Sequence, residues 1–267
     1  MLSKNKIKLI RSLEQKKRRR EEGLFVAEGP KVVGDLLEAG YKAKLLVCTN
    51  QYFSKRHLAV EEVIEVSDDE LRKVSFLQHP QDVLGVFEIP NTAALHTPDP
   101  QSLCIALDGV QDPGNLGTII RIADWFGINQ IFCSTDTADA FNPKTVQATM
   151  GSIARVIITY TDLRQFFDTL PAGIPVYGTL LDGKNIYEEE LTEGGIIVMG
   201  NEGNGISEEI RQRINRRLLI PNYPQGRKTA DSLNVAIATA ITCNEFRRRT
   251  IKKLNRHAYY SSTETEL

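Results

Sequence analysis

The chain of 267 residues is 41% hydrophobic and 25% charged, with a formal net charge of −1. This composition is typical of a globular protein with one large domain or two smaller ones, and no apolar run approaches the roughly 20 residues that a membrane span needs. The basic N-terminus lacks the apolar segment of a secretion signal, so we expect a cytoplasmic protein.

The cysteines and histidines do not form a metal-binding pattern. The cysteines, at 48, 104, 133 and 243, are far apart and include no C-x-x-C pair, and no histidine lies near one of them. We therefore expect four reduced, packed thiols and no metal site.

The first 90 residues predict a small α/β domain. A charged helix over residues 3–22 precedes a short strand, LFVAEG, and a helix, PKVVGDLLEAG, that starts with Pro30 and stops at Gly40. The segments KAKLLVC, VIEVS and VLGVFEI read as strands, and DDELRKVS reads as a helix. Residues 91–101, rich in proline and without periodicity, are expected to form a linker.

Residues 102–250 predict a second domain. The expected strands are SLCIALDGV, IFCS, ARVIITY, IPVYGTLL, GGIIVMG and RLLIPN, with helical segments between them. Such continuously apolar strands indicate a mostly parallel sheet that is covered on both faces and binds ligands at the carboxyl ends of its strands. The last helix is expected from Ser232 to Arg249, followed by a mobile, polar tail over residues 251–267.

Basic residues gather in three places despite the near-neutral total charge. The clusters are Lys16 to Arg20, Arg211 to Arg217, and Arg247 to Lys253. A local basic patch can bind phosphates even when acidic residues elsewhere cancel its charge. Each cluster can equally be a solvated helix face, and the sequence leaves both interpretations open.

The first loop that carries candidate chemistry is ALDGVQDPGNLGTIIRIADWFG. It leaves a strand at Asp108 and is expected to enter a helix near Leu116, with Asn115 as the N-cap and Arg121 about a turn and a half further on. This geometry suits anion binding, although a capped helix with a surface arginine would show the same pattern.

The second loop is IIVMGNEGNGIS, in which a buried strand ends in glycines at 200, 203 and 205. The spacing matches neither the dinucleotide fingerprint nor the phosphate loop. A simple turn needs one glycine, so three predict close approach of a ligand, with Asn201 and Glu202 free for polar contacts and Ser207 capping the next helix.

The third loop is LLIPNYPQGRKTADSLNVAIATAIT. It carries the basic pair Arg227 and Lys228 and enters the last helix through Ser232, Leu233 and Asn234. Polar residues at a helix start are often only caps, and Ser232 by itself fits that role.

Together the segments N-L-G-T-I-I-R, M-G-N-E-G-N-G, I-P-N and S-L-N-V-A, in this order, resemble the motifs of the SpoU (TrmH-type) branch of the SPOUT RNA methyltransferases. The resemblance covers about residues 103–249. The segment FVAEGPKVVGDLLEAG and the basic residues before it resemble the start of the substrate-binding domain, similar to ribosomal protein L30e, that often precedes the catalytic domain. FLQHPQDVLGV departs from the family's simpler turn, which leaves the RNA contact of that loop open.

The resemblance implies a trefoil-knotted α/β fold, a homodimer, and methyl transfer from S-adenosylmethionine to a ribose 2′-hydroxyl. The implied cofactor-binding residues are Thr179, Leu180, Gly200, Asn201, Gly203, Gly205, Ile220 and Leu233. The implied RNA-binding residues are Lys16, Lys17, Arg18, Arg19, Arg20, Arg227 and Lys228.

Arg121 matches the motif arginine to which the family assigns substrate activation. A guanidinium is too weak an acid to serve as a base, so we expect Arg121 to hold a phosphate and stabilise the developing oxyanion. The residues expected to orient it and the ribose are Asn115, Glu202, Ser232 and Asn234. The proton acceptor of the 2′-hydroxyl stays open.

The 2′-hydroxyl makes RNA the expected substrate, and a separate substrate-binding domain favours ribosomal over transfer RNA. The alternative is a non-catalytic RNA-binding protein with a decayed methyltransferase domain. A nicotinamide-dependent oxidoreductase would need the glycine fingerprint, which is absent from this sequence.

Overall fold

The computed structural model describes residues 2–49, 52, 60–90, 98–224 and 227–263, so part of the predicted linker and the end of the tail lie outside the described residues. The chain divides into two compact units. The first contains Met1–Ala93, Asp112–Arg121 and Ala138–Ile157, and the second contains the remainder. None of the helices described is long and apolar enough to cross a membrane.

The first unit is built on a four-stranded sheet in the order β1-β4-β2-β3. The strand β4 pairs antiparallel with β1 and β2, and β3 adds to β2 in parallel. The predicted strands and helices are present, with the bounds β1 Leu24–Glu28, α3 Pro30–Glu38, β2 Ala43–Cys48, β3 Val63–Glu65, α5 Asp68–Val74 and β4 Val83–Glu88.

The predicted helix over residues 3–22 is wrong, because the segment forms two helices, α1 (Lys4–Ser12) and α2 (Lys16–Glu22). The chain turns at Leu13, which is fully buried in the core of the first unit. The guanidinium of Arg19 donates to the carbonyl oxygens of Leu13 and Glu14, at 2.8 and 2.7 Å, and so stabilises this turn.

Two later segments complete the first unit: the start of α6 (Pro113–Trp125), and the region of α7 (Pro143–Ala148) and the 3-10 turn η1 (Ser152–Ala154). Helix α7 packs on β1, where the rings of Phe25 and Phe141 lie 4.8 Å apart. The hydroxyl of Tyr41 donates to the carbonyl oxygen of Ile153 at 3.2 Å.

The second unit contains a six-stranded sheet in the order β10-β8-β9-β5-β6-β7. The pairs β10–β8, β8–β9, β9–β5 and β5–β6 are all parallel, which confirms the predicted mostly parallel α/β fold. The trefoil knot stays a prediction. The strands are β5 Leu103–Asp108, β6 Gln130–Cys133, β7 Ile157–Tyr160, β8 Val176–Asn185, β9 Gly195–Gly200 and β10 Arg216–Leu219.

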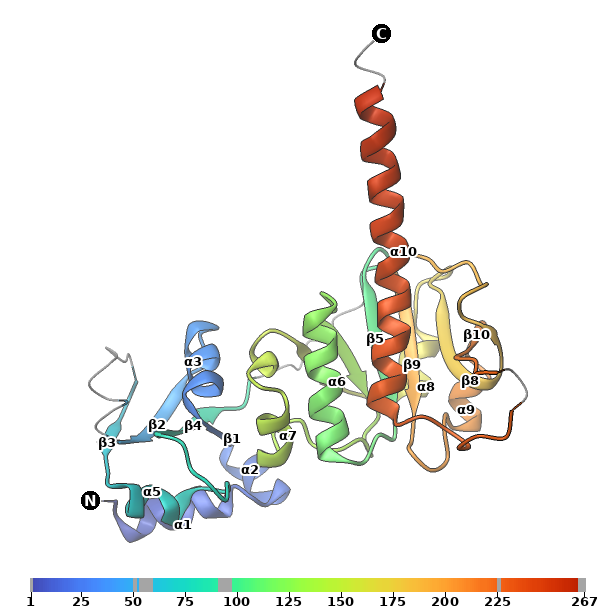
Figure 1. Ribbon diagram of the computed structural model, residues 1–267. Coiled ribbons are helices and arrows are strands. Elements are labelled where there is room, and N and C mark those ends of the chain that lie inside the picture. Colours follow the sequence, from blue (N-terminus) through green and yellow to red (C-terminus); the bar gives the residue numbers. More distant parts are fainter. Residues whose placement is uncertain (1, 50–51, 53–59, 91–97, 225–226, 264–267) are drawn as a thin grey trace. The chain divides into compact units, whose positions relative to one another are not determined.

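Helices cover both faces of this sheet, as continuously apolar strands require. Residues Ile196 and Val198 face α8 (Leu163–Asp168) and α9 (Glu208–Arg211) in one core cluster. On the opposite face, Tyr177 packs edge-on against Phe246 of α10 (Val235–Thr263), which runs beside β9 (Figure 1).

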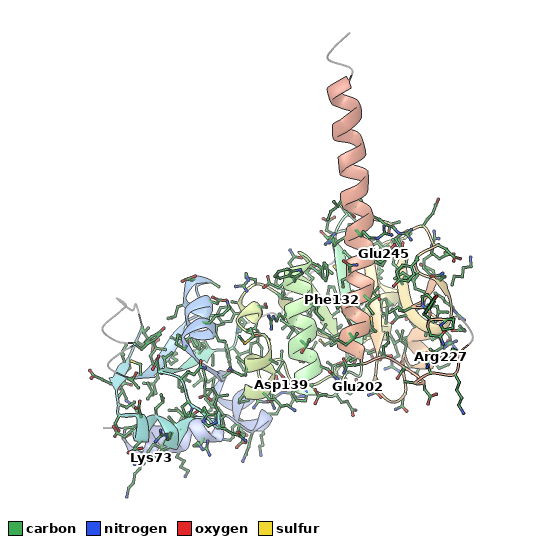
Figure 2. The ribbon with its side chains drawn as sticks, viewed as in Figure 1. Lys73, Phe132, Asp139, Glu202, Arg227 and Glu245 are labelled. Atoms are coloured by element: carbon green, nitrogen blue, oxygen red, sulfur yellow. The ribbon has the colours of Figure 1, made fainter. Side chains whose placement is uncertain are left out.

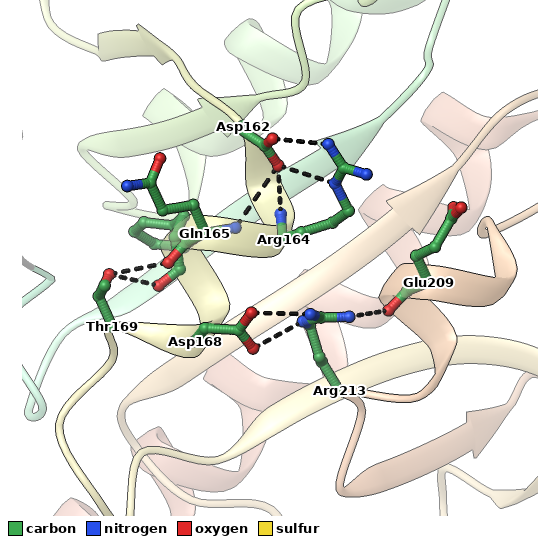
Figure 3. Close-up of polar contacts among 8 residues, drawn as sticks. Asp162, Arg164, Gln165, Asp168, Thr169, Glu209 and Arg213 are labelled. Atoms are coloured by element: carbon green, nitrogen blue, oxygen red, sulfur yellow. Dashed lines mark hydrogen bonds and ion pairs between the residues drawn. The ribbon is translucent and has the colours of Figure 1, made fainter.

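Most described residues of the second and third basic clusters hold the fold together. Arg213, which follows α9, forms a bidentate pair with Asp168 of α8 at 2.8 and 2.7 Å and donates to the carbonyl oxygen of Glu209 of α9 at 2.7 Å (Figure 3). Both Arg211 and Arg217 pair with Asp182, and Arg247 donates to the carbonyl oxygens of Phe126 and Gly127. These contacts give the arginines a structural role, and phosphate binding by the two clusters stays a prediction.

The four cysteines are buried and unpaired, as the sequence predicts. Burial raises the pKa of Cys104 to about 11, so this thiol stays protonated at neutral pH.

Helix α10 differs from the prediction at both ends: it begins at Val235 rather than Ser232 and continues past Arg249 to Thr263. The helix bounds do not test the predicted mobility of the tail, which stays a prediction. The buried Glu245, labelled in Figure 2, accepts hydrogen bonds from Arg248 and Arg249, each at 2.7 Å. Arg249 also donates to the carbonyl oxygen of Ile186, which ties the helix to the segment after β8.

Replacing Glu245 with Gln should lower the free energy of unfolding by about 2 kcal/mol at pH 7, because both arginines lose a charged acceptor. The hydrogen bond from Arg248, with that from Arg249, lowers the pKa of Glu245 below its ordinary 4.5. This stabilisation is therefore present above pH 4.5 and is lost as the pH falls through the folded-state value. Urea unfolding of both proteins from pH 7 to pH 3 checks this; a difference independent of pH would contradict it.

Candidate active site

The first loop enters helix α6 earlier than the sequence predicts. The helix starts at Pro113, and Asp112 accepts a hydrogen bond from the backbone N–H of Asn115 at 2.8 Å. This bond, together with the nearby Lys144, lowers the pKa of Asp112. The prediction of Asn115 as the N-cap is therefore wrong: Asn115 lies in the first turn, and Asp112 is the capping residue.

Helix α6 packs closely on α7 at Gly117. A methyl carbon at Gly117 would lie 2.5 Å from Cβ of Ala148 and 2.6 Å from the carbonyl oxygen of Thr145, so only glycine fits here. One turn later Arg121 is exposed, and its side chain makes no hydrogen bond or ion pair with the residues that the structure describes. Its guanidinium is thus available for a ligand.

The glycine-rich turn after β9 is closed by its own residues. Asn201 and Gly205 exchange two backbone hydrogen bonds, at 2.8 and 2.9 Å. The side-chain oxygen of Asn201 accepts from the N–H groups of Gly203 and Asn204, at 2.9 and 3.0 Å. Its amide nitrogen donates to the carbonyl oxygen of Gly109 at 2.7 Å. The prediction that Asn201 is free for a ligand is wrong, since both ends of its side chain hold the turn.

Gly200 allows this turn to close. A methyl carbon there would lie 2.2 Å from the carbonyl carbon of Gly205 and 2.3 Å from the nitrogen of Ile206. Gly205 has a φ of +70°, which favours glycine, whereas a methyl carbon at Gly203 would meet only the Asn201 oxygen at 3.5 Å. Glycines 200 and 205 therefore serve the fold of the turn directly.

The carboxyl ends of β5 and β9 lie side by side, with Asp108 opposite Gly200. A carboxylate oxygen of Asp108 accepts from the N–H of Ser207 at 2.7 Å, which connects the end of β5 to the start of α9. Glu202, labelled in Figure 2, accepts from the N–H of Gln111 at 3.2 Å, so it is not free as predicted. The turn after β9 is in this way fixed to the loop that leads into α6.

The strand β8 places Thr179 and Leu180 beside this turn. Gly178 pairs with Val198 of β9, and the hydroxyl of Thr179 donates to the carbonyl oxygen of Val198 at 3.3 Å. On its other side β8 leaves β10 after Gly178 and rejoins it at Lys184, opposite Leu218. Leu180 and Ile220 are both half-buried at this edge of the sheet.

The third loop brings Asn234 to the start of α10, where its side chain accepts from the N–H groups of Ala236 and Ile237 at 2.9 and 3.3 Å. Asn234 is thus the capping residue, the role that the sequence suggested for Ser232. Ser232, Arg227 and Lys228 are exposed, and half of the Leu233 side chain is exposed, at 51%.

The basic helix α2 divides into exposed and buried residues. Lys16, Lys17 and Arg20 are exposed, and Arg18 pairs with Glu21 and Glu22. The prediction of a phosphate contact does not hold for Arg19, because its side chain is only 1% exposed and pairs with Asp139 at 2.6 Å.

Within the second unit, the structure therefore brings the second loop to the end of β5. The pairing of β8 with β9 places Thr179 and Leu180 beside the end of β9. Arg121 and Asn115 belong to the first unit, so their convergence with Glu202 and Asn234 stays a prediction. The sequence interpretation missed Asp112 and Asp108. For Asp112 the signal was present, because Asp before Pro is a common start of a helix.

The methyltransferase class follows from comparison with known proteins. Residues 102–244 match the model of the SpoU rRNA methylase family, and residues 4–85 match the MRM3-like substrate binding domain. The chain belongs to the SpoU rRNA methylase family, which places it among the RNA methyltransferases.

Several relatives match nearly the whole chain. The 23S rRNA (guanosine(2553)-2′-O)-methyltransferase RlmP of Bacillus subtilis is 32% identical over 239 residues, 88% of this chain and 93% of RlmP. A TrmH-family protein of Porphyromonas gingivalis is 44% identical, with a TM-score of 0.83 over 93% of this chain and 99% of that one. An AdoMet-bound rRNA methyltransferase of Sinorhizobium meliloti is 35% identical, with a TM-score of 0.82 over 93% of this chain and 96% of that one.

Proposed function

We propose that this chain transfers a methyl group from S-adenosylmethionine to a ribose 2′-hydroxyl of ribosomal RNA. The observation that carries the proposal is similarity to a 23S rRNA 2′-O-methyltransferase over 88% of the chain, including both matched domains. The proposal also includes a trefoil knot and a cytoplasmic location.

The proposed cofactor-binding residues of the second unit fit S-adenosylmethionine chemically. Leu180 and Ile220 are half-buried and Leu233 is 51% exposed, so each leaves apolar surface that suits a purine ring. The turn from Gly200 to Gly205 would supply backbone groups, and the hydroxyl of Thr179 lies beside the end of β9, where it donates to the carbonyl oxygen of Val198. S-adenosylmethionine supplies an electrophilic methyl group when it is bound.

The remaining chemistry is positioning and charge stabilisation, which this chain's own side chains provide. The 2′-oxygen must approach in line with the methyl group and must lose its proton. The exposed guanidinium of Arg121 would hold a neighbouring phosphate and stabilise the developing negative charge. Glu202, Asn234, Asn115 and Ser232 would keep the surrounding loops and the ribose in place.

We further propose that two copies of the chain form a homodimer. Apolar side chains remain exposed at the start of α10, where Leu233 and Ile237 are 51% and 52% exposed. Cross-linking or light scattering in solution tests this assembly, and a monomer at micromolar concentration would count against it.

A non-catalytic RNA-binding protein is the alternative. Calorimetry with S-adenosylmethionine separates the two, because saturable binding is expected only if the methyltransferase site is intact. Mapping ribose methylation in total RNA with and without the gene then identifies the modified nucleotide, and an unchanged map would refute the proposed function.

The triple variant Lys16→Ala, Lys17→Ala, Arg20→Ala should bind RNA more weakly and with less dependence on salt. These three residues are exposed on α2. Each phosphate contact contributes about 0.7 to the slope of log K against log salt for single strands, so losing three contacts should reduce the slope by about 2. Fluorescence anisotropy with an rRNA fragment at several salt concentrations measures this; an unchanged slope would remove α2 from the RNA-binding surface.

A further inference from the structure

The first unit contains parts of both matched domains. It combines Met1–Ala93, which includes the substrate-binding domain, with Asp112–Arg121 and Ala138–Ile157 from the methylase match. The start of α6, with Arg121, therefore lies in the same compact unit as the basic helix α2.

A buried ion pair joins these two parts. Both Nε and Nη2 of Arg19 donate to one carboxylate oxygen of Asp139, at 3.1 and 2.6 Å. The side chains are 1% and 15% exposed, so water screens the pair little. The remaining donor group of Arg19 is used by the carbonyl oxygens of Leu13 and Glu14. Arg19 thus fixes the turn before α2 to Asp139, in the segment that leads into α7.

Asp139, labelled in Figure 2, also bonds to residues that lead into α7 and to the first turn of that helix. Its second carboxylate oxygen accepts from the N–H of Phe141 at 3.0 Å. Its carbonyl oxygen accepts from the hydroxyl of Thr145 at 3.0 Å and from the N–H of Asn142 at 3.1 Å. Loss of the carboxylate would therefore loosen this helix start.

Helix α7 passes the constraint on to α6. The two helices are in close contact at Gly117, where a methyl carbon would lie 2.5 Å from Cβ of Ala148. The Nζ atom of Lys144 lies 3.5 Å from a carboxylate oxygen of Asp112, the capping residue of α6. Arg121 is on the same helix, one turn beyond Gly117.

We propose that Arg19 and Asp139 are positioning residues that hold the helix of Arg121 in a fixed place relative to the RNA-binding face of α2. This inference rests on the proposed function, since it assigns the pair to alignment of the ribose with Arg121. In this proposal the exposed residues of α2 bind the RNA, and the buried Arg19 of the same helix fixes the position of Arg121.

The experiment compares the 267-residue chain with its Arg19→Met variant and, as a milder change, its Asp139→Asn variant. We expect kcat for methylation of rRNA to fall about 10- to 100-fold, as a displacement of about 1 Å would cause, with unchanged affinity for S-adenosylmethionine and unchanged KM for RNA. Hydrogen–deuterium exchange should rise in residues 112–121 and 139–149 and stay the same in β8 and β9.

Arg213→Met is the matched control, because it removes an ion pair between an arginine and Asp168 of α8 within the second unit (Figure 3). It should leave kcat and exchange in α6 unchanged. Wild-type kcat in the folded variants, or a change in KM alone, would overturn the proposal. Loss of folding in both variants would also overturn the proposal, because the Arg19–Asp139 pair would then be needed for the stability of the whole first unit. If the wild-type chain methylates no RNA, the proposed function fails. Unchanged hydrogen–deuterium exchange in α6 of the variants separately refutes the proposal that the Arg19–Asp139 pair holds α6 in place.

Discussion

Replacing Arg121 with Ala should lower kcat for methyl transfer about 100- to 1,000-fold, the usual cost of removing one donor that stabilises a developing oxyanion. The side chain is exposed and has no hydrogen bond or ion pair within the described part of the chain, so the substitution should leave the stability unchanged. Single-turnover transfer of labelled methyl groups to rRNA measures the effect.

Two controls separate the role of Arg121 from simple RNA binding. Arg121→Lys keeps the charge but loses the planar pair of donors, so it should recover only part of the rate. Binding of S-adenosylmethionine should match wild type in both variants. Full turnover of Arg121→Ala with unchanged RNA affinity would remove this residue from the mechanism.

Replacing Gly200 with Ala should destabilise the second unit and weaken cofactor binding. The added carbon would lie 2.2 Å from the carbonyl carbon of Gly205, so backbone must move. Overpacking of this kind costs about 1–3 kcal/mol. Because the same turn lines the proposed cofactor site, we expect the affinity for S-adenosylmethionine to fall about tenfold or more, the equivalent of about 1.4 kcal/mol. Thermal unfolding and calorimetry measure the two effects.

Gly203→Ala is the matched control for stability, because its added carbon makes only an ordinary contact, 3.5 Å from the Asn201 oxygen. Its melting temperature should equal that of wild type. Equal destabilisation by the two substitutions would show that the close contact at Gly200 is not the cause.

The fold class could be predicted because apolar strands and capped helices leave local signals. Six apolar strands indicated a covered parallel sheet, and the sheet has parallel pairs with helices on both faces. The break at Leu13 was missed, since a charged segment with helical residues on both sides gives no local sign that one leucine is buried.

Long-range pairing limited the prediction of the site. Arg19 sits within a run of five basic residues, and its partner Asp139 lies 120 residues further along the chain. The same holds for Asn201, which was expected to face a ligand but bonds to Gly109, 92 residues away. Residue type and spacing identified the three loops, whereas contacts across the fold decide which side chains remain available.

Methyl transfer to ribose can be measured by incubating the purified 267-residue chain with rRNA and S-adenosylmethionine that carries an isotopically labelled methyl group. The RNA is then digested to nucleosides and analysed by mass spectrometry. We expect label in one 2′-O-methylated ribonucleoside and none in the matching DNA sequence. Label on a base, or transfer to no RNA despite bound cofactor, would contradict it.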